Sequence, residues 1–280
     1  MSTRVRDALM RHLGELRHEP SERRVRARLA DQTVIDSTRA VLVWEPRRVV
    51  ASYAVPVEDV HGDLIPLPSL PATASSAAVG FHVPDIGKLP VLDPRIPFAV
   101  HTTDGESVGV RGRDGSRLGA GFRPTDPDLA GHVILDFASF DAWFEEDERI
   151  VSHPRDPFHR IDVLPSSRRV RLTLDGYVLA ESTRARLLFE TMLPVRYYMP
   201  REDVRTELHP SATRTYCAYK GEASYWSATV GGRVVSDLVW SYDAPLHDAA
   251  GVSGLVAFFD ERVDLVLDGQ RRERPLTPWS

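Results

Sequence analysis

Hydrophobic and polar residues alternate along much of the chain, which is the pattern of half-buried β-strands. The alternation from Val170 to Leu174 is followed by Asp175-Gly176, a dipeptide that favours a tight hairpin turn. A second alternating stretch covers residues 223–242 and turns at Gly231-Gly232. The pattern predicts a mostly β protein built from antiparallel strands.

Helical spacing occurs in only a few places. Residues 4–17 predict an amphipathic helix that docks on the protein or faces a partner. Its apolar positions are Val5, Leu9, Leu13 and Leu16. Short helical turns are expected after Pro200, over residues 245–250 and near Asp128. The fold should therefore contain few short helices besides the N-terminal one.

The chain also repeats itself. Arg-Arg-Val-Arg at 23–26 recurs at 168–171, and Ser-Thr-Arg-Ala at 37–40 recurs at 182–185, both 145 residues later. Pro-x-Glu-Asp-Val occurs at 56–60 and again at 200–204. Ordered matches of this kind indicate tandem duplication of one small β domain.

The repeat predicts five segments along the chain. They are an N-terminal helical extension (1–22), a diverged first repeat (23–149), a linker (150–166), a second repeat (167–272) and a tail (273–280). Two histidines and an aspartate in the linker could ligate an ion, but its prolines favour an ordered connection. A loop rich in Pro, Ala and Ser is expected over residues 66–78.

Composition limits the classes of function. The net charge is −5 and the basic residues are scattered, which argues against nucleic-acid binding. No apolar stretch approaches the roughly 18 residues that span a membrane, and residues 1–24 are charged throughout, so we expect a cytoplasmic protein without membrane contact. Cys217 is the single cysteine, which excludes an internal disulfide and a cysteine-based zinc site.

The chemically richest segment covers residues 215–226. Gly221 permits a tight turn, so Cys217 and Lys220 could face one cavity, where the ammonium would favour a nucleophilic thiolate. Cys217 and Lys220 are therefore the predicted catalytic residues. The alternative is that Cys217 is a small buried residue and that Lys220 and Glu222 form a surface pair.

Aromatic side chains with a few polar groups typically line small-molecule sites. The predicted ligand-binding residues are Arg201, Glu222, Tyr225, Trp226, Trp240 and Tyr242. Arg201, which aligns with Val57 of the first repeat, could hold a carboxylate or phosphate. The acids of the shared Pro-x-Glu-Asp-Val motif suit a helix start and are expected to be structural. Residues 103–108, aligned with the rich segment, keep Gly-Glu but lack its cysteine, lysine and Tyr-Trp pair.

The second repeat resembles the bacterial family catalogued as domain of unknown function 427. The resemblance rests on residues 198–204, 217–226, 240–242 and 256–259. It implies a β-tent, in which two antiparallel sheets lean together. The family has also been labelled a possible nucleotidyltransferase. Gly115-Ser116 and Asp126-Pro-Asp128 nominally fit such an enzyme, but the proline would break the strand that holds both acids.

These observations predict a small-molecule-binding protein, with or without catalytic activity, whose pocket lies in the second repeat near its interface with the first. Tyr225, Trp226 and Tyr242 would form its walls, and Arg201 and Lys220 would bind an anionic ligand. The alternative is a non-catalytic interaction module built as an intramolecular pseudo-dimer, and nucleotidyl transfer is third. We expect no cofactor and no metal ion, and either a monomer with pseudo-dimeric repeats or a homodimer.

Overall fold

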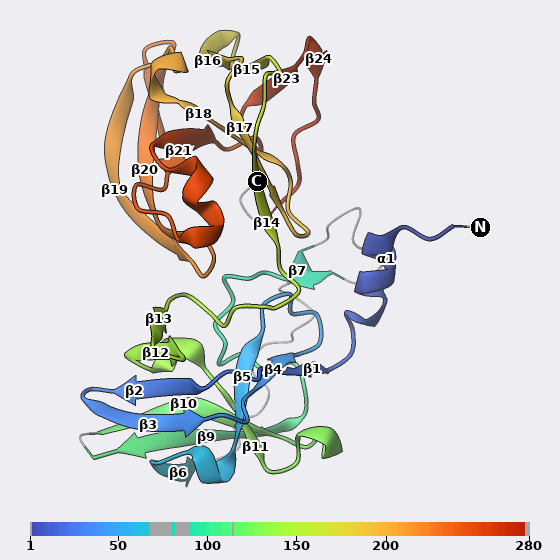
Figure 1. Ribbon diagram of the computed structural model, residues 1–280, viewed down its shortest axis with the longest axis vertical. Helices are drawn as coiled ribbons and strands as arrows, with labels where there is room; N and C mark the ends of the chain where they lie inside the picture. The colour runs from blue at the N-terminus through green and yellow to red at the C-terminus, as the bar shows by residue number, and fades with distance from the viewer. Residues whose placement is uncertain (1, 68–79, 82–89, 114, 278–280) are drawn as a thin grey trace. The chain divides into compact units, whose positions relative to one another are not determined.

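The computed structural model describes residues 2–67, 80–81, 90–113 and 115–277 (Figure 1). It divides the chain into two compact units, Met1–Asp156 (unit 1) and Pro157–Ser280 (unit 2). Both units consist of antiparallel strands joined by turns and short helices, so the expected mostly β fold is confirmed. The loop expected over residues 66–78 lies, from residue 68 onward, outside the described residues.

Unit 1 holds a seven-stranded and a four-stranded sheet. In spatial order the larger sheet contains β1 (Arg17–Pro20), β4 (Val41–Trp44), β5 (Ser52–Pro56), β11 (His132–Leu135), β10 (Gly115–Pro124), β9 (Gly105–Gly112) and β6 (Asp63–Pro66). The smaller contains β13 (Glu148–Ile150), β12 (Ala142–Glu145), β2 (Val25–Leu29) and β3 (Gln32–Ser37), and a separate pair joins β7 (Gly80–Phe81) to β8 (Val91–Leu92). Its helical elements are α1 (Val5–Leu9), η1 (Met10–His12), η2 (Val57–Asp59), η4 (Pro127–Leu129) and η5 (Phe137–Ser139).

Unit 2 also holds one seven-stranded and one four-stranded sheet. The larger contains β14 (Ile161–Pro165), β17 (Arg186–Glu190), β18 (Arg196–Pro200), β22 (Leu255–Phe258), β21 (Arg233–Ser241), β20 (Gly221–Val230) and β19 (Leu208–Cys217). The smaller contains β16 (Tyr177–Ser182), β15 (Val170–Leu174), β23 (Asp264–Leu267) and β24 (Gln270–Arg271). Its helical elements are η6 (Arg201–Asp203) and η7 (His247–Val252).

The two units share the strand order of both sheets. The order β1-β4-β5-β11-β10-β9-β6 has the counterpart β14-β17-β18-β22-β21-β20-β19, and β13-β12-β2-β3 has the counterpart β24-β23-β15-β16. The register agrees as well: Val25 pairs with Ser37, and Val170 pairs with Ser182. A β-bulge follows at Ala27/Arg28 in one unit and at Leu172/Thr173 in the other.

The shared sequence motifs contact each other within each unit. Arg39 of the first Ser-Thr-Arg-Ala motif donates to Asp59 at 2.6 Å, and Arg184 of the second donates to Asp203 at 2.8 Å. Burial raises the pKa of both aspartates, but these ion pairs outweigh it and hold the pKa of each below its usual value. The acids of Pro-x-Glu-Asp-Val thus tie a helical turn to a neighbouring loop, in keeping with their expected structural role.

Strand register changes one detail of the repeat alignment. Ser107 pairs with Phe122 in unit 1, at the place where Tyr225 pairs with Trp240 in unit 2. Counting back along β9 and β20 makes Gly105 the counterpart of Ala223 rather than of Gly221. The expected equivalence of the two Gly-Glu dipeptides is therefore wrong by two residues, because the loops that precede β9 and β20 differ.

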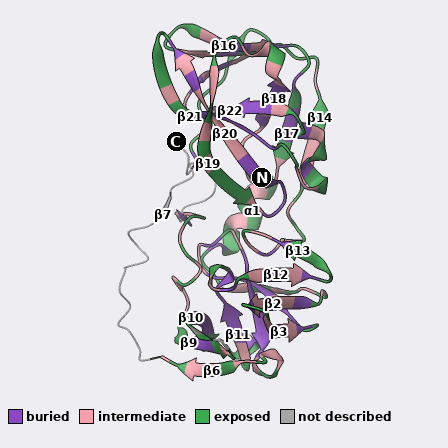
Figure 2. Cartoon of the chain, turned by 90° about the vertical axis from the view of Figure 1, so that its left-hand side faces the viewer, coloured by how far each residue is buried: buried purple, intermediate pink, exposed green. Residues whose placement is uncertain are grey.

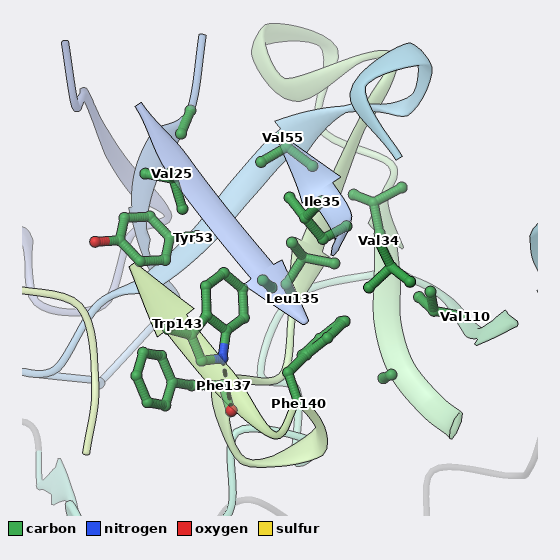
Figure 3. Packing of buried hydrophobic residues seen from close by; sticks show 14 of the residues in the cluster. Val25, Val34, Ile35, Tyr53, Val55, Val110, Leu135, Phe137, Phe140 and Trp143 are labelled. Atoms are coloured by element: carbon green, nitrogen blue, oxygen red, sulfur yellow. Dashed lines mark hydrogen bonds between the residues drawn. The ribbon is translucent and has the colours of Figure 1, made fainter. Parts of the chain in front are cut away.

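The main core of each unit lies between its two sheets. In unit 1 the Trp143 ring stacks on Tyr53 and Phe137 at centroid distances of 5.5 and 5.1 Å and meets Phe140 edge-on (Figure 3). Its indole N–H donates to the Phe137 carbonyl at 2.9 Å, so the buried polar atom is satisfied. In unit 2 the corresponding space is filled mainly by aliphatic side chains of both sheets, from Val170 to Leu267, together with Phe258. Figure 2 colours the buried residues of these strands purple.

Unit 2 has a second apolar layer on the other face of its large sheet. Leu188, Tyr198, Trp240 and Tyr242 lie there, and Ala249 and Val252 of η7 pack against them. We call this the outer face of the sheet, and the face that meets the small sheet the inner face. Both faces of the large sheet are therefore partly buried, and each can hold a site.

The expected helix over residues 4–17 is shorter in the structure. α1 and η1 end at His12, and β1 begins at Arg17 because it pairs with β4. Leu13 is buried, whereas Val5 and Leu9 are exposed. The expected linker 150–166 is also shorter, since Ile161–Pro165 is an edge strand paired with β17.

The short helical turns expected from the sequence are present as η6, η7 and η4. Each is a 3-10 segment placed near the expected residues. Among the described residues, no helix is both long and apolar enough to cross a membrane.

Candidate functional site

The predicted site residues of unit 2 fall on opposite faces of its large sheet. Successive side chains of β20 point to alternate faces, so Tyr225 packs in the outer layer while Trp226 packs in the inner core. Cys217 pairs with Gly221 at the end of β19, which puts it on the outer face. The structure thus separates residues that the sequence grouped into one pocket.

A buried acid lies at the centre of the outer group. Glu190 ends β17, and its side chain is only 6% exposed. Lys220 Nζ donates to Glu190 Oε2, and His159 Nε2 hydrogen-bonds to Oε1 at 3.1 Å. The His159 ring also stacks on Tyr219 with a centroid distance of 4.0 Å. We call Glu190, Lys220 and His159 the Glu190 cluster.

The charges of the Glu190 cluster compensate one another. Burial raises the pKa of Glu190, but Lys220 and His159 outweigh it and hold the pKa at about 2. The carboxylate is therefore ionised at neutral pH and keeps the Lys220 ammonium in an ion pair. Lys220 was expected to bind an anionic ligand, and the structure instead gives that ammonium an internal partner.

The aromatic residues of the outer group pack against one another. Trp240 Nε1 donates to the Tyr198 hydroxyl at 2.9 Å, and the centroids of the Trp240 and Phe259 rings lie 4.6 Å apart. Burial raises the pKa of Tyr198 and Tyr242. Trp240 and Tyr242 therefore fill the layer beneath η7, and half-buried Tyr225 hydrogen-bonds to Thr215 at 2.9 Å.

The inner group is built around Arg201 and Trp226. The Arg201 guanidinium lies over the Trp226 ring, 4.1 Å from its centroid. Both side chains donate to the hydroxyl of Ser241, at 3.5 Å from Arg201 Nη2 and 3.3 Å from Trp226 Nε1. Ser241 Oγ donates in turn to Asp243 Oδ1 at 3.1 Å, and Ser224 Oγ donates to Asp243 Oδ2 at 3.0 Å. We call these five residues the Arg201 patch.

Arg201 differs from its arginine neighbours in having no carboxylate partner among the described residues. Arg184 pairs with both acids of η6, and Arg214 pairs with Glu222 at 3.5 Å. Glu222 is exposed and contacts Arg214, so the alternative of a Lys220–Glu222 surface pair is wrong.

Unit 1 shows which of these features the fold itself requires. Glu45 is the counterpart of Glu190 and is also buried, but it accepts from the backbone N–H of Thr102 at 2.9 Å and bonds to His101 at 3.1 Å. A buried glutamate with a histidine thus occurs in both units, whereas among the described residues only Glu190 of unit 2 contacts a lysine.

The Arg201 patch has no counterpart in unit 1. Val57 takes the place of Arg201, and Val108 takes the place of Trp226. The cross-strand pair Ser224–Ser241 is matched by Glu106–Arg123. The same sheet is therefore built without the stacked guanidinium and without the two serines.

The remaining sequence candidates serve local structure. Asp126 accepts from the backbone N–H of Asp128 at 3.0 Å and caps η4, so this acid pair contributes to a turn. Within the described ranges, no group of three or more His, Cys, Asp or Glu side chains is arranged to hold a metal ion. Of the histidines at 153–160, His159 bonds to Glu190.

Sequence reasoning missed several members of both groups. Glu190 carried a signal, because it matches Glu45 at the repeat offset. Strand alternation places Ser224 and Ser241 on the same face of the sheet only once the pairing of β20 with β21 is known. Asp243 lies beyond the end of β21 and had no signal in the sequence.

Unit 2 is thus an antiparallel two-sheet β domain with a buried acid cluster on one face of its large sheet and a stacked arginine on the other. Its residues 162–269 match the family described as "Domain of unknown function (DUF427)", which confirms the resemblance noted from the sequence. No curated protein matches the chain.

Proposed function

We propose that unit 2 is a small-molecule-binding domain and that Arg201 binds an anionic group of its ligand. One observation supports the proposal: the guanidinium lies over the Trp226 ring, and no acid of the described residues pairs with it. Arg184 and Arg214, at nearby positions of the same domain, both have carboxylate partners. An unpaired, oriented arginine suits an external anion better than it suits fold stability.

The geometry favours bidentate recognition. A guanidinium has five N–H donors in a rigid fork, and Ser241 accepts from only one of them. Stacking on an indole contributes roughly 0.5–2 kcal/mol and fixes the plane of the fork before a ligand arrives. Side-chain entropy is then lost during folding rather than on binding, which favours affinity for a carboxylate or phosphate.

The test compares Arg201→Gln with Arg184→Gln at constant ionic strength. Phosphate, acetate and citrate serve as probes, and thermal unfolding together with the Trp226 indole resonance serves as readout. We expect saturable binding of at least one anion that Arg201→Gln abolishes and Arg184→Gln retains. Equal binding by both variants, or no saturable binding of any probe by the unaltered protein, would contradict the proposal.

Two further expectations belong to this proposal. The common strand order and bulge positions support an origin of the two units by tandem duplication. A cytoplasmic site of action is retained as part of the proposal. Catalysis by Cys217 and Lys220 is not, because Glu190 already engages the ammonium.

A non-catalytic interaction module is the second candidate. It is favoured by the packing of Trp240 and Tyr242 into the layer beneath η7, where they fill space rather than line it. This candidate predicts that Arg201→Gln leaves the binding of the protein to its partners unchanged. The same variant therefore distinguishes the two functions. The role of Asp126 as a cap gives nucleotidyl transfer no support.

A further inference from the structure

Asp243 is held in place as firmly as Arg201, although it is exposed. Each of its carboxylate oxygens accepts one hydrogen bond, from Ser241 at 3.1 Å and from Ser224 at 3.0 Å. These contacts fix the plane of the carboxylate and leave further lone pairs on both oxygens. Asp243 makes no ion pair with a described residue. Unit 2 therefore presents an oriented acid as well as an oriented base.

Ser241 connects the two charges. Its hydroxyl has one hydrogen, which goes to Asp243, so it can only accept from Arg201 and Trp226. Arg201 and Asp243 thus both hydrogen-bond to Ser241 Oγ, yet they form no ion pair with each other. A direct salt bridge would neutralise both groups, and the serine keeps them close but separate.

The other charges on this part of the sheet cancel. Arg214 is the cross-strand partner of Ser224, and its guanidinium pairs with Glu222 at 3.5 Å. This pair therefore adds no uncompensated charge beside Ser224. In unit 1 the cross-strand pair Glu106–Arg123 occupies the place of the two serines, so the hydroxyl that joins the two charges in unit 2 is missing there.

We infer that the ligand carries a carboxylate and a protonated amine on one short backbone, as an amino acid does. Arg201 would receive the carboxylate and Asp243 the ammonium. This inference rests on the proposed anion site and specifies its substrate class. Two complementary charges raise specificity because a purely anionic molecule meets Asp243 as a like charge. The patch thus selects for zwitterions over simple acids.

The test uses zwitterions and acids that differ by one group. Glycine, β-alanine and 4-aminobutyrate increase the distance between the charges, and acetate, propionate and butyrate are their matched acids. The Trp226 indole N–H donates to Ser241 at the centre of the patch, so its resonance reports binding directly. We expect at least one amino acid to bind tenfold or more tightly than its matched acid.

Two variants separate the roles of the charges. Asp243→Asn should remove the preference for the amino acid while retaining affinity for the acid, and Arg201→Gln should abolish both. Asp248→Asn, an exposed acid on η7, is the matched control and should change neither. Thermal unfolding of each variant verifies that the domain is folded.

The outcomes distinguish the inference from the proposed function. If acids bind as tightly as amino acids and both require Arg201, the anion site stands and the zwitterion inference is overturned. The inference is also overturned if Asp243→Asn leaves the preference intact, or if only phosphate binds. Binding that survives Arg201→Gln would refute the anion site itself.

Discussion

The Glu190 cluster makes the stability of unit 2 depend on pH in a way that one substitution can isolate. Burial alone would favour protonated Glu190, yet its two partners bring its pKa from the ordinary 4.5 to about 2. A group whose pKa falls on folding stabilises the folded state above its unfolded pKa, and it loses that contribution as the pH falls toward its folded pKa. The contribution is about 3 kcal/mol above pH 5.

Glu190→Gln removes this contribution while keeping the shape of the side chain. Because all other groups titrate in both proteins, the difference in unfolding free energy between them reports Glu190 and its contacts. The comparison starts at pH 5.5, about one unit above the ordinary glutamate pKa, where Glu190 is ionised in the unfolded chain as well. From there to pH 3.5 the difference should shrink by about 1.4 kcal/mol.

The assay is urea denaturation at several pH values, with unit 2 followed by the indole resonances of Trp226 and Trp240. Glu222→Gln is the control, since this exposed carboxylate forms a surface ion pair with Arg214 and should contribute less than about 1 kcal/mol at any pH. A difference between the unaltered protein and Glu190→Gln that stays constant from pH 5.5 to 3.5 would refute the ion-pair explanation.

Three further substitutions test other parts of unit 2 by the same denaturation assay. Arg196 donates to both oxygens of buried Glu261, at 2.8 and 2.6 Å, so Glu261→Gln should lower the free energy of unfolding by about 3–5 kcal/mol. Changing both residues to Met should cost less than the sum of the two single changes to Met. Tyr198→Phe deprives the Trp240 indole of its acceptor and should cost about 1–3 kcal/mol, with faster exchange of that N–H. Gly221→Ala should cost about 1–2 kcal/mol, because φ is +88° in the turn that leads to β20.

The fold was largely predictable because its signals are local. Asp175-Gly176 and Gly231-Gly232 join β15 to β16 and β20 to β21 as expected, since few other residues adopt the positive φ of such turns. The repeat was readable because its motifs contact one another and so constrain the same residues in both units. The helix over residues 4–17 was overestimated, since pairing of β1 with β4 competes with helical periodicity there.

The candidate site was only partly predictable, because its contacts join residues far apart in sequence. Lys220 reaches Glu190 on another strand, and Arg201 reaches Trp226 and Ser241. The sequence grouped Tyr225 with Trp226 because they are adjacent, yet adjacency in a strand puts them on opposite faces. Which face each occupies depends on register, and bulges in β19, β20 and β21 shift it.

Comparison of the two units argues for the inner face as the place of function. A buried glutamate is present in both units, so the acid belongs to the fold, and unit 1 satisfies it with backbone N–H groups and a histidine. Lys220 therefore replaces donors that the fold otherwise supplies, which explains its presence without a ligand. Nothing comparable explains the Arg201 patch: unit 1 packs Val57 and Val108 at the places of Arg201 and Trp226 and keeps the same strand order. An exposed acid and a half-buried base that are each oriented, yet kept apart by Ser241, contribute little to stability and much to recognition of a molecule with complementary charges.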